Sequence, residues 1–450
     1  MRDIGATTMS NSTHRLLPLT KPALEQPNST SCSAPASALA NRAAPANKTV
    51  SAKTNLIGVT ALRGWAAVAV VVLHACMPYS TPAMPGLVWS VTDTPSQTAT
   101  VLMWSIEVVI MPVFLVVAGF LASQSMANRG PSKTLKNRLK RLGWPLLWTT
   151  LFLIPVDLYI WLCGLLADGV ITPRKLQSLK FDDALDSKIW GLSHLWFLQY
   201  LMTYVALLAL GWDRLQSIGT TSLRRWGLPA CLGIAVAVLA ARPEVVWGFQ
   251  HAFLPVASKW IYSGVFFLAG AMWWRLDPQL QALTEHSKRL IGPSVMLWTA
   301  AVTVGIWWLT QAPNATASMV NQTSLAILTV AAAACVTFAL VGLSMRKVNR
   351  LGPITGRLAS ASFLIYLLHH PVVGLAHISA KYAATDFPVW IKVVGVTLIG
   401  VGAGIVVDFL GQCRRERSAS GTNETSQDTL PFESAARMVP ESTESRTRAA

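Results

Sequence analysis

Long runs of apolar residues alternate with short polar connections over most of the chain. A helix of about 20 apolar residues, rising about 1.5 Å per residue, crosses the hydrocarbon core of a bilayer. Runs that approach this length lie at 57–79, 99–125, 144–167, 193–211, 226–241, 258–274, 290–310, 323–344, 358–379 and 390–411. The pattern predicts an all-α fold, a polytopic membrane protein with about ten transmembrane helices.

Composition supports this prediction and sets the ends of the membrane domain. Hydrophobic residues make up 52% of the 450 residues, charged residues make up 13%, and the mean hydropathy is +0.44, which excludes a water-soluble protein. Residues 1–55 and 413–450 are rich in small and polar residues, and neither segment resembles a signal peptide or an amphipathic helix. We expect two disordered tails around a transmembrane domain at 56–412.

The formal charge of +16 orients the protein and does not mark a nucleic-acid interface. Lys and Arg are spread over short loops and are most frequent after the second, fourth, sixth and eighth apolar runs. The positive-inside rule places these loops and both termini in the cytoplasm. The six cysteines form no CxxC pair or Cys/His cluster, so we expect no metal site. The sequence leaves the oligomeric state open.

A small set of polar residues interrupts the apolar runs. Each costs several kcal/mol at membrane depth unless it is paired, so each is a functional candidate. The set comprises Arg63, His74, Glu107, Asp157, His194, Gln199, His369, His370 and Asp408.

Arg63 and His74 lie on one helical stripe. They are eleven residues apart, almost three whole turns, and therefore about 16 Å apart along the axis. A cation near one membrane surface and an imidazole nearer the other outline a route through the protein. The alternatives are an arginine that snorkels to the interface and a histidine that is hydrogen-bonded in the core.

The segment Phe363–Pro371 places two imidazoles, His369 and His370, just before a proline. Adjacent helical residues point about 100° apart. We therefore expect only one of the two rings to face the same cavity as His74, while the other packs or supports it.

Basic and aromatic residues mark two further segments. Arg138 and Arg141 are three residues apart on one predicted helix face, a spacing suited to phosphate, although a plain topology signal is the alternative. Ser193 is expected to cap a helix that begins with His194 and Trp196, and here the alternative is an interfacial aromatic belt.

Several motifs in order resemble the acyltransferase 3 family of integral membrane acyltransferases. They span about residues 57–411 and are specific as a set, whereas each alone is weak. The matching stretches are Ala61–Arg63 with His74 (Arg-x10-His), Met111–Phe114 with Ala118–Phe120, Arg138-x-x-Arg141 with Pro145, Ser193–Leu198, Phe266–Gly270 and Ser362–Pro371.

The resemblance implies a ten-helix bundle in a bacterial inner membrane. Such a bundle takes an acyl group, for example succinyl or acetyl, from cytoplasmic acyl-CoA and delivers it to a hydroxyl of a periplasmic or cell-surface glycan. By position, His74 corresponds to the family's catalytic histidine, and Arg63 to the arginine of the same motif. Arg138 and Arg141 correspond to the pair that handles the donor. Acyl-CoA is then a substrate, and no bound cofactor is expected.

Two positions depart from the family pattern. Thr60 stands where an aspartate usually precedes the first-helix arginine, and Ala118 stands where serine is common. Without that aspartate, we expect Glu107 or another buried acid to neutralise Arg63.

We expect His74 to act as general base for the acceptor hydroxyl, with an acyl-histidine relay as the alternative. The remaining candidates would orient the acceptor or support the oxyanion: Glu107, His194, Trp196, Tyr366, His369 and His370.

Two other classes of function remain open. A transporter of a sugar, lipid or small anion would also need many helices and buried charges, but such proteins commonly carry an internal repeat, and none is visible here. A catalytically inactive scaffold is the second alternative, which the loss of the aspartate at Thr60 keeps open.

Overall fold

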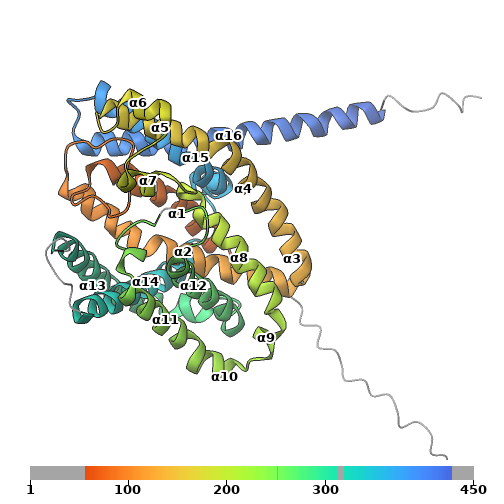
Figure 1. Cartoon of the computed structure of the whole chain (residues 1–450). Helices are drawn as coiled ribbons and strands as arrows, with labels where there is room; N and C mark the ends of the chain where they lie inside the picture. Colours follow the sequence, from red (N-terminus) through yellow and green to blue (C-terminus); the bar gives the residue numbers. More distant parts are fainter. Residues whose placement is uncertain (1–55, 251, 312–318, 428–450) are drawn as a thin grey trace, which may run out of the picture. The chain divides into compact units, whose positions relative to one another are not determined.

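A computed structural model describes residues 56–250, 252–311 and 319–427, and all regular structure in these ranges is helical (Figure 1). Side chains are described up to residue 416, with those of residues 184 and 187 excepted. The predicted N-terminal tail, residues 1–55, and the end of the C-terminal tail lie outside the described residues. The all-α prediction is confirmed for the described part of the chain.

The helices follow one another with short connections. In chain order they are α1 Ile57–Cys76, α2 Gln97–Arg129, α3 Pro131–Arg138, α4 Trp144–Trp148, α5 Ile154–Ala167, α6 Pro173–Ser178, α7 Asp183–Ile189, α8 Trp196–Leu210, α9 Trp212–Ser217, α10 Thr220–Ser222, α11 Leu228–Ala241, α12 Ala257–Leu276, α13 Gln281–Gln311, α14 Met319–Lys347, α15 Pro353–Ala383 and α16 Val389–Gln427. Short 3-10 or π-helical turns extend or join them at Met77–Tyr79, Leu139–Gly143, Thr149–Leu153, Ser193–Leu195, Leu223–Gly227 and Pro243–Val245.

Nine helical segments of the described chain are long and apolar enough to cross a membrane. They coincide with nine of the ten predicted spans. The remaining prediction, 258–274, falls on α12, which is helical over 20 residues but is not among the nine. Lys259 and Arg275 near its two ends reduce its apolar character. These helices fit a multi-pass membrane protein.

Glycines set the closest helix crossings. A side chain at Gly119 of α2 would meet the carbonyl of Phe267, and one at Gly270 of α12 would meet the carbonyl of Val116. The two glycines thus face each other's backbones where α2 and α12 cross. Small residues allow membrane helices to approach this closely, so these two motif glycines serve packing.

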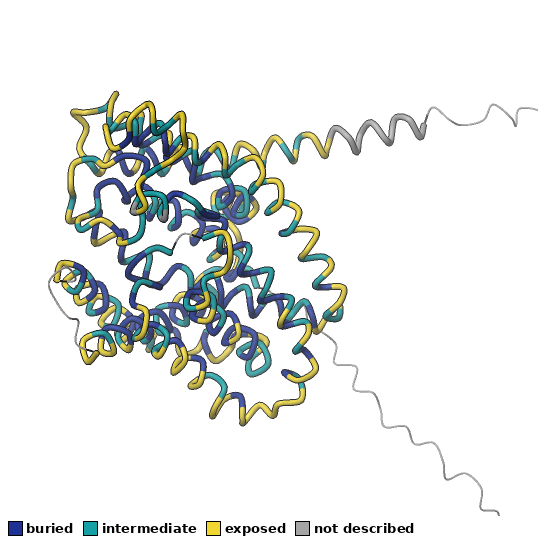
Figure 2. Tube along the Cα trace, viewed as in Figure 1, coloured by how far each residue is buried: buried dark blue, intermediate teal, exposed yellow. Residues whose placement is uncertain are grey.

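The segment from α3 to α5 forms one helical run, Pro131–Ala167, with two π-helical turns. Pro145 and Pro155 directly follow these turns. Proline lacks an amide donor and clashes with the preceding turn, and a π-turn is a common local adjustment to such a break. Large apolar side chains on this run are exposed, among them Trp144 and Phe152, as is much of α16, and such surfaces suit contact with lipid (Figure 2).

One ion pair and one hydrogen bond to an ion-paired aspartate fasten the connection between α1 and α2, residues 80–96, to neighbouring helices. Lys392 donates to Asp93 at 2.9 Å, and Lys381 donates to Asp168, which also accepts from the Thr92 amide at 2.9 Å. Burial opposes ionisation of both aspartates, but these donors outweigh it, so the pKa of each carboxyl lies below its ordinary value. The connection is therefore pinned at two points.

The C-terminal boundary differs from the prediction. Disorder was expected from residue 413, but α16 continues to Gln427. The added stretch contains Arg and Glu, which favour helix, and the first proline after it is Pro431. Apolar periodicity alone does not reveal such a polar extension of a membrane helix.

Candidate active site

A partly enclosed cavity of about 80 Å³ lies between several helices. It has room for about five water molecules or one small acyl group. Its polar and aromatic lining residues are His74, Trp89, Glu107, Asp157, Trp161, Lys188, Ser193, His194, Trp196, Lys259, Tyr366 and His370. Six predicted site residues from distant parts of the sequence are among them, namely His74, Glu107, His194, Trp196, Tyr366 and His370.

The ring of His74 is held in one tautomer. Its Nδ1 lies 2.8 Å from the carbonyl of Val70, so this nitrogen carries the proton and donates it. The Nε2 atom then has a lone pair. Because His74 lines the cavity, this lone pair is suited to accept a proton from a bound hydroxyl.

His369 and His370 divide two roles between them. His369 does not line the cavity but lies behind His74, with its Nε2 3.3 Å from Nδ1 of His74. Its own Nδ1 donates to the carbonyl of Tyr366 at 2.8 Å, which leaves Nε2 as an acceptor. His370 lines the cavity. Consecutive residues of α15 therefore place the ring of His370 in the cavity and the ring of His369 behind His74.

His370 is paired with a buried carboxylate. Its Nδ1 lies 2.8 Å and 3.0 Å from the two carboxylate oxygens of Asp157, and both side chains are buried. Trp161 stacks on the imidazole of His370 at 4.4 Å between ring centroids, with 7° between the planes. Asp157 and Trp161 both come from α5, so α5 fixes the orientation of a ring on α15.

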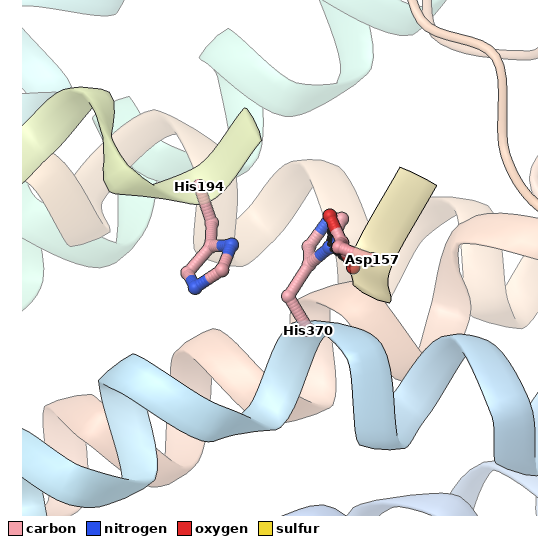
Figure 3. Close-up of side chains that lie close together, drawn as sticks. All are labelled: Asp157, His194 and His370. Atoms are coloured by element: carbon pink, nitrogen blue, oxygen red, sulfur yellow. Dashed lines mark hydrogen bonds and ion pairs between the residues drawn. The ribbon is translucent and has the colours of Figure 1, made fainter. Parts of the chain in front are cut away.

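His194 approaches the same group from the start of α8 (Figure 3). Its ring stacks on His370 at 4.8 Å and 13°, and its Nε2 donates to the carbonyl of Leu367 at 3.1 Å. Its Nδ1 is buried without a hydrogen-bond partner among the described residues. Tyr366 donates to the backbone carbonyl of His194 at 2.7 Å and so holds this turn in place.

Asp157, His194 and His370 could supply ligands to a metal, because one donor atom from each lies within 4.8 Å of the others. An imidazole binds a metal along a lone pair in its ring plane. The rings of His194 and His370 are nearly parallel, so their lone pairs do not converge. One ring would have to leave the stack before both could bind one ion, and the contacts to Trp161 and Asp157 oppose this.

Trp89 connects the cavity to the pinned connection between α1 and α2. Its indole stacks on His74 at 5.7 Å between centroids and donates to Nδ1 of His377 at 3.0 Å. Nε2 of His377 in turn donates to the carbonyl of Ala75 at 3.2 Å. Trp89 therefore covers one face of the His74 ring.

Glu107 does not neutralise Arg63, so that expectation is wrong. Glu107 lines the cavity and interacts electrostatically with Lys259 of α12. The ammonium of Lys259 also lies 3.9 Å from the ring centroid of Trp196 and 4.6 Å from that of Phe249. Arg63 instead donates to the carbonyl of Ala359 at 3.3 Å. Glu107 of α2 faces the cavity beside His74, whereas Arg63 lies three turns of α1 away from His74.

The arginines form a separate group. Arg63 and Arg141 are exposed, and Arg138 lies close enough to Arg63, Arg129 and Arg141 for all three to act on its charge. None of the four lines the cavity among the described residues. The predicted pair thus lies near Arg63 and away from the histidines.

The comparisons with known proteins decide the family. A family model described as an acyltransferase domain matches residues 56–408, which is most of the chain. The chain belongs to the acyltransferase 3 family. No curated protein and no solved structure matches the chain significantly. Membership implies an acyltransferase, and the apolar helices fit an enzyme of the membrane.

Sequence reasoning missed several residues of this acyltransferase's cavity. Lys259 was overlooked although a lysine inside a predicted membrane span is unusual, and that signal could have found it. Asp157 was noted as a polar residue in a membrane span, but no pattern paired it with His370, which is 213 residues away. Ser193 was expected to cap a helix. The structure shows no capping bond at that end and places the serine hydroxyl beside His370.

Proposed function

We propose that the protein is a membrane-embedded O-acyltransferase that moves an acyl group from cytoplasmic acyl-CoA to a glycan hydroxyl. The observation that carries the proposal is the state of His74. Its Nδ1 is held by the carbonyl of Val70 and by His369, and its Nε2 belongs to a ring that lines the partly enclosed cavity. Such a nitrogen accepts the hydroxyl proton as the acyl carbon is attacked, a role worth about 10²- to 10⁴-fold in rate.

The enclosure of the cavity suits a thioester substrate. Water that reached the acyl carbon would compete with the acceptor hydroxyl, and a small aromatic-walled cavity limits that competition. Its volume of about 80 Å³ admits an acyl group and one hydroxyl, so we expect the glycan to enter with its reacting hydroxyl first.

The arginines would hold the donor at the cytoplasmic side. The phosphates of CoA would bind Arg138 and Arg141, and the extended arm of CoA would run past Arg63 along α1. Arg63 and His74 are separated by about 16 Å of this helix, so one helix would span the distance from donor recognition to chemistry. This assignment places both termini in the cytoplasm, the bilayer around the bundle, and the acceptor in the periplasm of a bacterial cell.

Within the family, the motifs are most like those of glucans biosynthesis protein C, which suggests succinyl transfer to osmoregulated periplasmic glucan. That protein tends to carry an arginine where this chain has Ile110. A succinyl donor has a second carboxylate that needs a cation. Lys259 lines the same cavity as Ile110, but it faces Glu107 there, so a succinyl carboxylate would share this cation with Glu107.

Mass spectrometry of the cell's glycans tests the proposal. Periplasmic glucans and surface polysaccharides would be compared between cells with the wild-type protein, the His74→Ala variant or no protein. His286→Ala, which changes an exposed histidine of α13, is the matched control. We expect an acyl mass increment with the wild type and the control only. Identical acylation in all strains would refute the proposal and favour a transporter or a lipid acceptor.

A further inference from the structure

We infer that Glu107 and Lys259 determine which acyl groups the cavity accepts, and that together they favour an uncharged acyl group over a dicarboxylic one. The inference rests on the proposed acyl transfer and adds to it the class of donor. Both side chains line the cavity that contains His74, one from α2 and the other from α12. Because the cavity is small, a second carboxylate on the acyl group would lie within reach of both charges.

Hydrogen bonds from α8 fix the turn of α12 that carries Lys259. The hydroxyl of Tyr200 accepts from the amide of Val256, which directly precedes α12, at 2.9 Å. The hydroxyl of Tyr204 donates to the carbonyl of Trp260 at 2.6 Å. These two bonds lie on either side of Lys259 in the sequence. The backbone from which the lysine extends is therefore held against α8.

Two aromatic faces and one acid act on the ammonium of Lys259. It lies 3.9 Å from the ring centroid of Trp196 and 4.6 Å from that of Phe249. Aromatic faces attract a cation but carry no formal charge. Glu107 supplies the opposite charge, and a buried lysine needs such a partner. The pair has no net charge, whether its proton resides on Lys259 or on Glu107.

The charged lining of the whole cavity balances in the same way. Two acids and two lysines line it, namely Glu107, Asp157, Lys188 and Lys259. With its histidines neutral, the described lining has no excess of positive charge. A dicarboxylic acyl group would bring one more negative charge into this space, and like charges close together in a low dielectric repel strongly. An uncharged acyl group leaves the balance unchanged.

The neighbours of Glu107 on α2 also suit an uncharged acyl group. Ile110 and Met111 follow Glu107 by three and four residues, so the three lie on one face of α2, and all of them line the cavity. An alkyl end is buried favourably against this apolar surface. A carboxylate would lose its hydration there and would share Lys259 with Glu107.

Removal of one charge at a time gives an expected order of donor preference. In Glu107→Gln, the ammonium of Lys259 is available to the second carboxylate of a succinyl group. In Lys259→Met, the carboxylate of Glu107 remains and repels that group. The double variant lacks both charges. The ratio of succinyl to acetyl transfer should therefore be highest in Glu107→Gln and lowest in Lys259→Met, with the wild type and the double variant between them.

A competition between two donors tests this order on the full-length protein in detergent. Equimolar succinyl-CoA and acetyl-CoA are incubated with the protein and a purified periplasmic glucan fraction, and the products are weighed by mass spectrometry. We expect the wild type to favour acetyl at least about 10-fold, and Glu107→Gln to raise the succinyl-to-acetyl ratio at least about 10-fold. The ratio does not depend on the fraction of each variant that folds. Glu285→Gln makes the same change at an exposed position of α13 and should keep the wild-type ratio.

Binding of each donor without acceptor separates this inference from the proposed function. The CoA part is common to both donors, so the ratio of their Kd values reports on the acyl end, and it should follow the same order. A wild type that favours succinyl, or product ratios that are equal in all variants, would refute the selection and leave the proposed function intact. If no glucan product formed but the Kd ratio followed the order, glucan as acceptor would be refuted and the selection supported. An unchanged Kd ratio without product would refute both.

Discussion

The two ends of α1 are built in opposite ways. At one end, His74 is held by the carbonyl of Val70, by His369 and by stacking with Trp89. At the other end, Arg63 is exposed and makes one hydrogen bond, to the carbonyl of Ala359. A proton transfer needs one fixed ring in one tautomer, whereas phosphate recognition tolerates a flexible cation.

The same contrast holds for electrostatics. Charges in the partly enclosed cavity act at short range in a low dielectric, where Asp157 is paired with His370. The arginines lie together with like charge and are screened by salt. Changes at the histidine end should therefore lower kcat, and changes at the arginine end should raise KM for the donor.

Replacement of His74 should have the largest effect. With succinyl-CoA or acetyl-CoA as donor and purified glycan as acceptor, His74→Gln should lower kcat about 10²- to 10⁴-fold. KM for the donor should stay the same, because the arginines are untouched. Thiol release and product mass would be measured on folded protein in detergent. A rise in KM without a fall in kcat would remove the distinction between the two ends.

Changes at His369 should have the next largest effect, through the position of His74. His369→Leu removes the acceptor that lies 3.3 Å from Nδ1 of His74, and we expect kcat to fall about 10²-fold from misplacement of the ring. His369→Gln offers another acceptor and should recover part of this rate. Equal rates in the two variants would show that His369 only fills space. The readout is the ratio of their kcat values in the same assay.

Sequence patterns within single helices predicted much of the difference between the two ends of α1. The eleven-residue spacing of Arg63 and His74 placed a cation and an imidazole on one helix, and the structure places them at its opposite ends. The 100° step between His369 and His370 predicted one ring in the cavity and one outside it, which is the observed arrangement. These predictions needed only the geometry of single helices.

Pairings between helices could not be predicted. Asp157 and His370 are 213 residues apart, and nothing in one helix indicates which neighbour will face it. The expected pair of Arg63 and Glu107 was wrong for the same reason. Whether the two side chains meet depends on how far along α1 and α2 each one lies, and the sequence does not give this relative depth. The glycine motifs of α2 and α12 also depend on a crossing that appears only in three dimensions.

Loss of the paired arginines should affect donor binding. Arg138→Gln and Arg141→Gln should each raise KM for acyl-CoA about 10-fold, with kcat little changed, since a charge-assisted hydrogen bond contributes about 1.5–3 kcal/mol. Added salt should raise the wild-type KM more than that of the double variant. Lys136→Gln, an exposed lysine on α3, is the matched control. An effect of similar size at Lys136 would indicate general charge attraction in place of a phosphate site.

The smallest expected effect concerns the residues that pin the connection over His74. Asp168→Asn weakens the bonds to Lys381 and to the Thr92 amide, and we expect Tm to fall by about 2–4 °C at pH 7. Burial raises the pKa of Asp168, but Lys381, Tyr382 and Thr92 lower it more, so its folded pKa lies below the unfolded value of about 3.9. The stabilisation is thus complete above that value and disappears as the pH falls through the folded pKa.

Thermal unfolding of wild type and Asp168→Asn between pH 3 and pH 7 measures the pH dependence of this stabilisation. The difference in Tm should be constant near neutral pH and shrink toward the acid end. Protonation of Asp168 removes from the wild type the negative charge that asparagine lacks at every pH. Asp182→Asn, whose pair with Lys175 is exposed, should change Tm little at any pH. If Asp168→Asn kept its full Tm but lost acyl transfer, Asp168 would act on closure of the cavity and not on stability. The His74 end of α1 would then depend on a movable cover as well as on fixed rings.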